Sequence, residues 1–313
     1  MEDKKLITVV TACYNEEDNI VEIYKQVKAV FDELPQYRYE HLFIDNCSED
    51  NTVSLLKNIA KKDKQVKLII NARNFGHIRS PVHGLLQAKG NAVISIVADL
   101  QDPPQMIHQF LQEWEKGWLV VAGVKVQTNE SFLLGMIRKC YYRFVTRIAS
   151  IKLVKNFTGF GLYDQKIIAA IRKLNDPYPY FRGIICEIGY PIKTIPYEQP
   201  PRTRGITKNN FYTLYDMAML GITSHSKLPL RLAIFAGFGL SIGSLLLSVF
   251  FLLLKLIYWD RFSFGLAPIL IGLFFFCSII LFFIGMLGEY VLSIQTQVQN
   301  RPLVYEEERV NFD

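Results

Sequence analysis

A cluster of oxygen-bearing side chains follows an apolar run in the segment VISIVADLQDPP, residues 93–104. The run is mostly β-branched and predicts a buried strand, which a Pro-Pro pair ends. Asp99 and Gln101 are two residues apart, so an extended chain would present both on the same side, with Asp102 directly after them. These hard oxygen ligands suit Mg²⁺ or Mn²⁺ shared with a diphosphate. For this segment alone, an Asp-Pro turn after a core strand is the alternative.

Polar turns also follow two earlier apolar runs, ITVVTACYN (residues 7–15) and YEHLFIDNCSEDNT (residues 39–52). Open α/β sheets bind their ligands at the carboxyl ends of the strands. We therefore expect one cleft to collect the side chains from all three strand ends: Thr11, Tyr14, Asn15, Glu16, Asp45, Asn46, Ser48, Asp99 and Gln101. An acidic cleft without a Gly-rich loop favours a diphosphate held through a metal over a dinucleotide site or a P-loop.

Strands and helices alternate along the first 125 residues. Strands are expected at 7–15, from 39, at 66–74 and from 93, and helices at about 19–31, 52–62 and 80–88. Alternation at this spacing predicts right-handed crossovers and a largely parallel sheet, so the fold class is α/β.

Two later segments are expected to be amphipathic helices. Residues 131–153 place an apolar stripe at helical spacing, with Lys139, Arg143 and Arg147 on another face. A basic amphipathic helix is typical of a segment on anionic lipid, although an ordinary solvated helix is the alternative. Residues 209–226 have a similar apolar side and lead directly into an uncharged segment, so an interfacial position is expected there too.

Half of the 313 residues are hydrophobic, and the excess is concentrated near the carboxyl terminus. Residues 232–254 and 262–288 carry no charge, and each run is long enough to cross a bilayer as a helix. We expect a catalytic domain over 1–226, spans at 230–257 and 265–289, and a tail at 290–313. A buried helical hairpin is the alternative. The acidic N-terminus lacks a small-residue cleavage site and is not a signal peptide.

The flanking charges predict the orientation and the location. Lys227 and Arg231 precede the first span and Arg301 follows the second, so both termini and the domain are expected on the cytoplasmic face of the plasma or inner membrane, with a multi-pass chain. The net charge of +6 suits an anionic membrane surface better than a nucleic acid. Five cysteines without CxxC spacing indicate thiols in a reducing compartment. The tail could add an edge strand to a neighbouring subunit, so a homo-oligomer is a further hypothesis.

The order of the motifs resembles one known family. TACYNEEDNI, FIDNCSEDNT, NARNFG and VADLQDPP look like the successive nucleotide-sugar motifs of glycosyltransferase family 2, which has the GT-A fold. Downstream, YFRGII, RTRGITKNN, GITSHSKLPLR and RPLVYEEE resemble the polyprenyl-phosphate branch, akin to dolichol-phosphate mannose synthase and the bactoprenol glucosyltransferases. The resemblance covers nearly the whole chain.

The resemblance implies roles for individual residues. Asp45 would hydrogen-bond the nucleobase, which is expected to be uracil, and Asp99 and Gln101 would hold the metal against the diphosphate. The nucleotide-sugar site would also include Thr11, Tyr14, Glu16, Asn74 and Gly76. Donor and acceptor phosphates would be held by Arg182, Arg202, Arg204 and Lys208, for which Arg provides bidentate contacts. The implied catalytic set is Asp99, Gln101, Arg202 and Lys208.

Three positions depart from the family pattern. Val97 stands where many relatives have an Asp, Asn156 where an Asp has been proposed as the catalytic base, and Gly161 where an Arg is usual. A phosphate monoester has its second pKa near ~6, so a polyprenyl phosphate is mostly dianionic at neutral pH and can attack without a general base. Asp164 and Glu187 are weakly supported substitutes for a base. The departure at Asn156 therefore weakens the assignment of a base but not the reaction.

The sequence predicts an inverting transfer of a sugar from a nucleotide-diphosphate sugar to polyprenyl (undecaprenyl) phosphate at the cytoplasmic membrane face. The product would be a lipid-linked monosaccharide for the modification of cell-surface glycans. A processive polysaccharide synthase is an alternative, but it would need more spans and a QxxRW motif, which the chain lacks. A second alternative is a catalytically degenerate transferase that acts as a scaffold or partner of a sugar-lipid flippase.

Overall fold

The computed structural model describes residues 4–126, 153–200, 219–220, 228–257 and 266–312. The amphipathic helices expected at 131–153 and 209–226 therefore lie almost entirely outside the described residues. The same is true of Arg202, Arg204 and Lys208.

The first 125 residues alternate between strand and helix, as expected. The elements are β1 (Leu6–Cys13), α1 (Glu17–Asp32), β2 (Arg38–Asp45), α2 (Thr52–Lys62), β3 (Val66–Asn71), α3 (Gly76–Gln87), β4 (Ala92–Val97), α4 (Met106–Glu115) and β5 (Val120–Lys125). Helix α3 begins at Gly76 rather than at Ser80, because Gly76 adopts a φ of +83° that turns the chain into the helix.

The strands form one eight-stranded sheet in the order β7-β5-β6-β4-β1-β2-β3-β8. At its centre β1 pairs in parallel with β2 and β4, and β2 pairs in parallel with β3. The antiparallel strands are β6 (Phe157–Asp164), between β4 and β5, and β8 (Glu306–Val310), beside β3. Strand β7 (Ile192–Tyr197) pairs in parallel with β5. The three strands that are followed by polar turns, β1, β2 and β4, are therefore parallel to one another.

Apolar side chains fill both faces of the sheet, which is typical of parallel strands covered by helices. Alternate residues of β1 point to opposite faces: Val9 lies in the cluster formed with α1, α2 and α4, and Val10 lies in the cluster formed with α3. Two further helices, α6 (Gln165–Leu174) and α7 (Phe181–Glu187), contribute to the second cluster.

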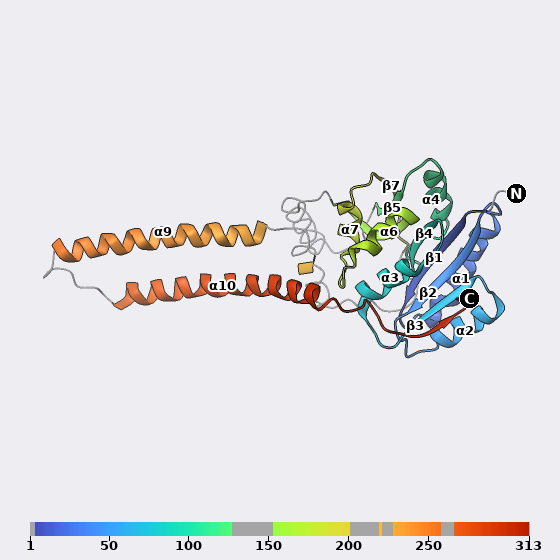
Figure 1. The fold of residues 1–313 in the computed structure, drawn as a ribbon, viewed down its shortest axis with the longest axis horizontal. Helices are drawn as coiled ribbons and strands as arrows, with labels where there is room; N and C mark the ends of the chain where they lie inside the picture. Colours follow the sequence, from blue (N-terminus) through green and yellow to red (C-terminus); the bar gives the residue numbers. More distant parts are fainter. Residues whose placement is uncertain (1–3, 127–152, 201–218, 221–227, 258–265, 313) are drawn as a thin grey trace.

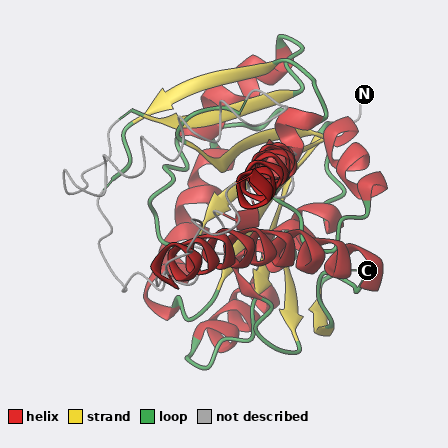
Figure 2. Cartoon of the chain, turned by 90° about the vertical axis from the view of Figure 1, so that its left-hand side faces the viewer, coloured by secondary structure: helices red, strands yellow, loops and turns green. Residues whose placement is uncertain are grey.

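Two long helices, α9 (Leu228–Ile257) and α10 (Leu266–Gln299), extend side by side from the domain, on the side opposite the N-terminus (Figure 1). Figure 2 views the molecule along these helices toward the sheet. Among the residues that the structure describes, the stretch Phe275–Gln299 of α10 is long and apolar enough to cross a membrane, and Leu230–Ser244 of α9 is a shorter apolar stretch. The second membrane span stays a prediction.

The C-terminal tail forms an edge strand on the β3 edge of its own chain, and the homo-oligomer stays a prediction. Strand β8 pairs antiparallel with β3, with Ile69 opposite Arg309, and the Ala72 N–H donates to the Tyr305 carbonyl at 2.9 Å. Beyond this pairing, the Lys57 ammonium lies 2.6 Å from the Glu308 carboxylate. The tail therefore fixes the end of α10 to the β3 edge of the domain.

Candidate functional site

The ends of β1, β2 and β4 meet at the same edge of the sheet. Cys13 lies opposite Asp45, and Ala12 lies opposite Val97, so the polar turns after these strands are neighbours. This adjacency confirms that the three strand ends converge. It follows from parallel pairing, which brings the carboxyl ends of the strands to one edge.

The turns after β1 and β2 interlock through backbone-to-side-chain hydrogen bonds. The Asn15 N–H donates to Ser48 Oγ at 2.8 Å, and the Glu49 N–H donates to Asn15 Oδ1 at 2.8 Å. The Glu16 N–H donates to Thr52 Oγ1 at 2.9 Å. Asn15 adopts a φ of 52°, a left-handed conformation that Asn tolerates better than most residues. The two turns therefore form one rigid unit.

Asp45 is fully buried at the centre of this unit. Its carboxylate accepts the Ser48 N–H at 2.9 Å and the Ser48 hydroxyl at 2.5 Å. Burial raises the pKa of Asp45, and the hydrogen bonds from Ser48 oppose that rise. Asp45 therefore organises the β2 turn whether or not a nucleobase is bound.

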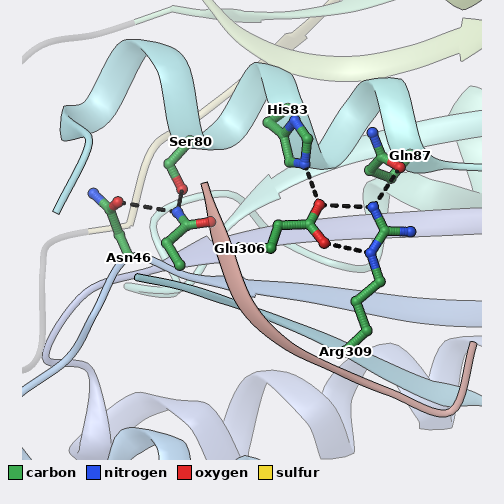
Figure 3. Close-up of polar contacts among 7 residues, drawn as sticks. Asn46, Ser80, His83, Gln87, Glu306 and Arg309 are labelled. Atoms are coloured by element: carbon green, nitrogen blue, oxygen red, sulfur yellow. Dashed lines mark hydrogen bonds and ion pairs between the residues drawn. The ribbon is translucent and has the colours of Figure 1, made fainter. Parts of the chain in front are cut away.

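An amide network joins the β2 turn to the β3–α3 loop. Asn46 Nδ2 donates to Asn74 Oδ1 at 2.8 Å, and Asn46 Oδ1 accepts the Phe75 N–H at 2.9 Å. Asn71 Nδ2 donates to Asn46 Oδ1 at 3.2 Å and to Ser80 Oγ at 3.0 Å (Figure 3). The predicted donor residue Asn74 is thus held on the same network as the end of β2.

Asp99 and Gln101 lie in a turn and not on an extended strand, which corrects the geometry expected from the sequence. Leu100 has a φ of 62°, and the Gln101 N–H donates to Asp99 Oδ1 at 3.2 Å. The left-handed residue reverses the chain between the two side chains, so their relation is set by the turn and not by strand alternation. Both side chains are partly buried.

Asp102 stabilises this turn through hydrogen bonds to β4 and β7, a role that the sequence did not indicate. It is buried, accepts the Tyr197 hydroxyl at 2.9 Å, and accepts the Val97 N–H at 3.3 Å. Burial raises the pKa of Asp102 to about 6, against the opposing effect of the Tyr197 hydrogen bond. The position of Asp102 between the turn and the Pro-Pro pair was visible in the sequence, but its partner on β7 was not.

Two further predicted binding residues, Thr11 and Arg182, contact neighbouring side chains of the domain. Thr11 has no exposed surface, and its hydroxyl lies 2.9 Å from Nε2 of the buried His41. It therefore joins β1 to β2 inside the core, and its expected role in the nucleotide-sugar site stays a prediction. Arg182 lies in the first turn of α7, with its guanidinium carbon 5.3 Å from the centre of the Tyr180 ring.

The unusual residues Asn156 and Gly161 both have structural roles. Asn156 adopts a φ of 56°, and its Nδ2 donates to the Lys125 carbonyl at 3.2 Å. A Cβ at Gly161 would lie 2.3 Å from the Val121 carbonyl oxygen, so the β5–β6 pairing leaves no room for a side chain. An Arg at this position is therefore incompatible with the strand pairing seen here.

The sequence profile of glycosyl transferase family 2 matches residues 8–172, which contain all three strand ends. The chain belongs to this family and is a glycosyltransferase with an α/β, GT-A-like fold and a mostly parallel sheet.

Relatives of this chain match it over nearly its whole length. An uncharacterized glycosyltransferase of Bacillus subtilis, YkcC, is 32% identical over 95% of this chain and 91% of its own. The bactoprenol glucosyl transferase of Shigella phage SfII is 31% identical over 95% of this chain and 96% of its own. A prophage homologue of that enzyme in Escherichia coli is 29% identical over 95% of this chain and 96% of its own.

Solved structures resemble the domain more distantly. A mannosyltransferase of Pyrobaculum calidifontis, in complex with GDP-Man and Mn²⁺, is 15% identical with a TM-score of 0.47 over 71% of this chain and 63% of that chain. The glucosyl-3-phosphoglycerate synthase of Mycobacterium tuberculosis, in complex with Mn²⁺, UDP and phosphoglyceric acid, is 16% identical with a TM-score of 0.47 over 70% of this chain and 76% of that chain.

Proposed function

We propose that the protein transfers a sugar, with inversion, from a nucleotide-diphosphate sugar to a polyprenyl phosphate at a membrane surface. The observation that carries the proposal is the convergence of the Asp45, Asn46 and Asp99 turns at the sheet edge. Near-full-length similarity to proteins named bactoprenol glucosyl transferase supports a polyprenyl acceptor. The expected product is a lipid-linked monosaccharide.

Asp99 and Gln101 would hold Mg²⁺ or Mn²⁺. Within the described residues, no group of three or more His, Cys, Asp or Glu side chains could hold a metal ion. A pair of oxygen ligands on one turn nevertheless fits a metal that takes its remaining ligands from substrate phosphates and water. When bound, such an ion neutralises the charge that develops on the leaving diphosphate.

The protein residues would then orient the two reacting groups. The locked turns after β1 and β2 present Tyr14 and Glu16 near the buried Asp45 and favour a fixed position for the nucleoside. Asp102 and Tyr197 hold the Asp99 turn in place, so that the anomeric carbon of the donor meets the acceptor in line. Uracil is the proposed base and UDP-sugar the proposed donor.

The acceptor needs little activation. The Asn156 side chain is an amide that donates to a backbone carbonyl, so it is not a base. A phosphate monoester is already mostly dianionic at neutral pH, and its oxygen can attack the anomeric carbon directly. Arg182, Arg202, Arg204 and Lys208 are the proposed phosphate-binding residues, and Arg202 and Lys208 the proposed basic members of the catalytic set.

We place both α9 and α10 across the membrane in this proposal. Strand β8 pairs with β3, so the chain after α10 returns to the side on which the domain lies, and it must cross an even number of times. Helix α9 has 30 residues, which at 1.5 Å per residue gives about 45 Å, more than the ~30 Å hydrocarbon core. Two crossings place the domain and both termini on the same side of the membrane, and the flanking cations Lys227, Arg231 and Arg301 favour the cytoplasmic side.

A transfer assay tests the proposal. Purified full-length protein is incubated with undecaprenyl phosphate, Mn²⁺ or Mg²⁺, and one of a panel of radiolabelled nucleotide sugars. We expect label from one donor in the lipid fraction, and no labelled lipid when EDTA is present. Labelled lipid from no donor would contradict the proposal.

Two observations favour a second candidate function. The space at Gly161 excludes the Arg that is usual in the family, and Asn156 replaces a proposed base. A catalytically degenerate transferase that acts as a scaffold or partner of a sugar-lipid flippase would bind a nucleotide sugar without transferring the sugar. Nucleotide binding without any lipid product in the same assay would favour this alternative.

A further inference from the structure

Three arginines surround the point at which the tail meets the β3–α3 loop. The guanidinium carbons of Arg73 and Arg79 lie 4.1 and 5.3 Å from the centre of the Phe75 ring. Arg79 Nη2 donates to the Pro302 carbonyl at 2.5 Å, and Arg301 directly precedes Pro302. We call Arg73, Arg79 and Arg301 the arginine cluster.

The positive charge of the cluster is not neutralised by the described residues around it. Within the described ranges, no carboxylate forms an ion pair with any of the three guanidinium groups. Arg79 Nε is buried and has no hydrogen-bond partner there. Burial and the charges of Arg73 and Arg301 lower the pKa of Arg79, as expected for cations that repel one another. An anion would relieve this repulsion.

A cavity of about 320 Å³ adjoins the cluster. Its lining combines the cluster residue Arg301 with Arg172 and with apolar side chains such as Val82 and Leu303. Asp176 also lines it, but Asp176 Oδ1 accepts from Gln297 Nε2 at 2.8 Å and from the Tyr178 N–H at 2.9 Å. A cationic group beside an apolar wall fits an anion that carries a hydrocarbon portion.

The position of the cluster indicates where that anion comes from. Helix α10 ends at Gln299, two residues before Arg301, and the tail then passes beside α3 (Figure 1). A helix that leaves a bilayer at this point brings the cluster to the level of the lipid headgroups. Arginines at the cytoplasmic membrane surface attract anionic lipids, and the guanidinium group forms paired hydrogen bonds with phosphate.

We propose that Arg73, Arg79 and Arg301 bind the phosphate of an anionic phospholipid, with the apolar wall of the adjoining cavity packing against the hydrocarbon portion of that lipid. The site rests on the proposed function in one respect, because it requires α10 to cross the membrane through its apolar stretch Phe275–Gln299, which ends ten residues beyond the span end expected from the sequence. Arg73 directly precedes the predicted donor residue Asn74, whereas the proposed metal turn follows β4. Its occupant would fix the donor loop and the tail against the membrane surface.

The test measures the thermal unfolding midpoint of the full-length protein in a non-ionic detergent with added dioctanoyl phosphatidylglycerol. The variant is Arg73→Gln with Arg301→Gln, because both side chains are exposed and neither forms a bond that holds the fold. Arg79 is left unchanged because it binds the tail. The matched control is Arg38→Gln with Lys61→Gln, two exposed cations elsewhere in the domain.

We expect phosphatidylglycerol to raise the midpoint of the wild type and of the control by about 2–4 °C and to leave the cluster variant unchanged. Dioctanoyl phosphatidylcholine and inorganic phosphate should raise none of them. An equal rise in the cluster variant, no rise in the wild type, or the same rise with phosphatidylcholine would overturn the proposal. A rise with inorganic phosphate alone would assign the cluster to a soluble phosphate.

A second arm adds UDP in place of the lipid. If the cluster variant loses a UDP-dependent rise but keeps the lipid-dependent one, the cluster belongs to the donor site and the proposal is wrong. The unfolding midpoint does not depend on sugar transfer. A protein that makes no lipid-linked sugar can therefore still show, or fail to show, lipid binding at the arginine cluster. The failure of the lipid site is thus distinguishable from the failure of the proposed function.

Discussion

At the scale of single residues, the Asp99 turn combines a strained backbone with a supporting carboxylate. Leu100 is in the left-handed region, which costs an L-residue roughly 1–2 kcal/mol. The turn persists because its neighbours hold it: Asp99 accepts the Gln101 N–H, and Asp102 joins it to Tyr197 and β4. A strained conformation held in this way is typical of functional sites.

Replacement of Asp99 tests the role of this turn. We expect Asp99→Asn to reduce the rate of sugar transfer by about 10²-fold or more, because an amide is a weaker metal ligand and leaves the diphosphate less neutralised. The rate of labelled lipid formation measures the effect at saturating Mn²⁺. The control, Asp32→Asn, removes an exposed carboxylate at the end of α1 and should leave the rate unchanged. An active Asp99→Asn enzyme would show that this carboxylate has no such role.

His41 gives the fold a specific dependence on pH. Burial lowers the pKa of His41 to about 3, whereas an unfolded His titrates near ~6.5. Between these values the unfolded state binds more protons than the folded state, so stability falls as the pH falls through this window. From pH 7.5 to 5 the loss from this group is about 2 kcal/mol.

The variant His41→Gln should therefore lose less stability than the wild type between pH 7.5 and 5, although it should be less stable at pH 7.5. Thermal unfolding midpoints at the two pH values measure the difference. His108→Gln serves as the control because His108 is not fully buried and pairs with an exposed Glu33. An equal acid-induced loss in His41→Gln and in the wild type would rule out His41 as the source.

At the scale of elements, the sequence predicted those strands and turns whose signals lie in a local run of residues. Periodicity and turn residues located the first four strands and their polar ends, because each strand carries its own apolar run and its own turn. The pairings of β6 and β8 depend on contacts between distant residues, such as Ile69 with Arg309, which no local pattern records. The contact of Thr11 with His41 was not predicted for the same reason, since His41 lies on another strand.

The tail strand is held to α3 by one carboxylate. Glu306 accepts from His83 Nε2 at 2.5 Å and forms an ion pair with Arg309, which also donates to Gln87 Oε1 at 2.8 Å (Figure 3). The Glu306 side chain is only 19% exposed, so loss of its charge leaves the Arg309 guanidinium without its anion and weakens the hydrogen bond with His83.

We expect Glu306→Gln to accelerate hydrogen exchange of the β3 and β8 amides about tenfold, because a local opening becomes easier by about 1.4 kcal/mol. The matched control is Glu307→Gln, which changes an exposed side chain on the next residue. Exchange measured by mass spectrometry on the full-length protein distinguishes the two variants. Similar exchange in Glu306→Gln and in the control would mean that backbone pairing alone holds the tail.

At the scale of the whole molecule, the polar ends of the parallel strands lie on the side of the domain from which the long helices extend (Figure 1). The N-terminus and the start of β1 lie on the side of the domain away from α9 and α10, so the parallel strands carry their polar ends toward the helices (Figure 1). If α9 and α10 cross the membrane as proposed, these polar ends face the surface at which a polyprenyl phosphate would present its headgroup. In the proposed function the helices and the tail would orient the site as well as anchor it.

Reporter fusions test this topology. The pairing of β8 with β3 requires the tail on the same side as the domain, so we expect a fluorescent protein fused after Asp313 to be fluorescent in the cytoplasm. Alkaline phosphatase fused after Ile257, at the end of α9, should be active outside the cytoplasmic membrane. The opposite result at either position would contradict two crossings.

The central claim is that the phosphate of a polyprenyl phosphate is the group that attacks the donor. The most direct measurement compares undecaprenyl phosphate with undecaprenol as acceptor, using the same labelled nucleotide sugar and full-length protein. We predict labelled lipid with the phosphate and none with the alcohol, because the alcohol would need a general base and Asn156 does not supply one. Equal transfer to both acceptors, or transfer to neither despite nucleotide binding, would contradict the claim.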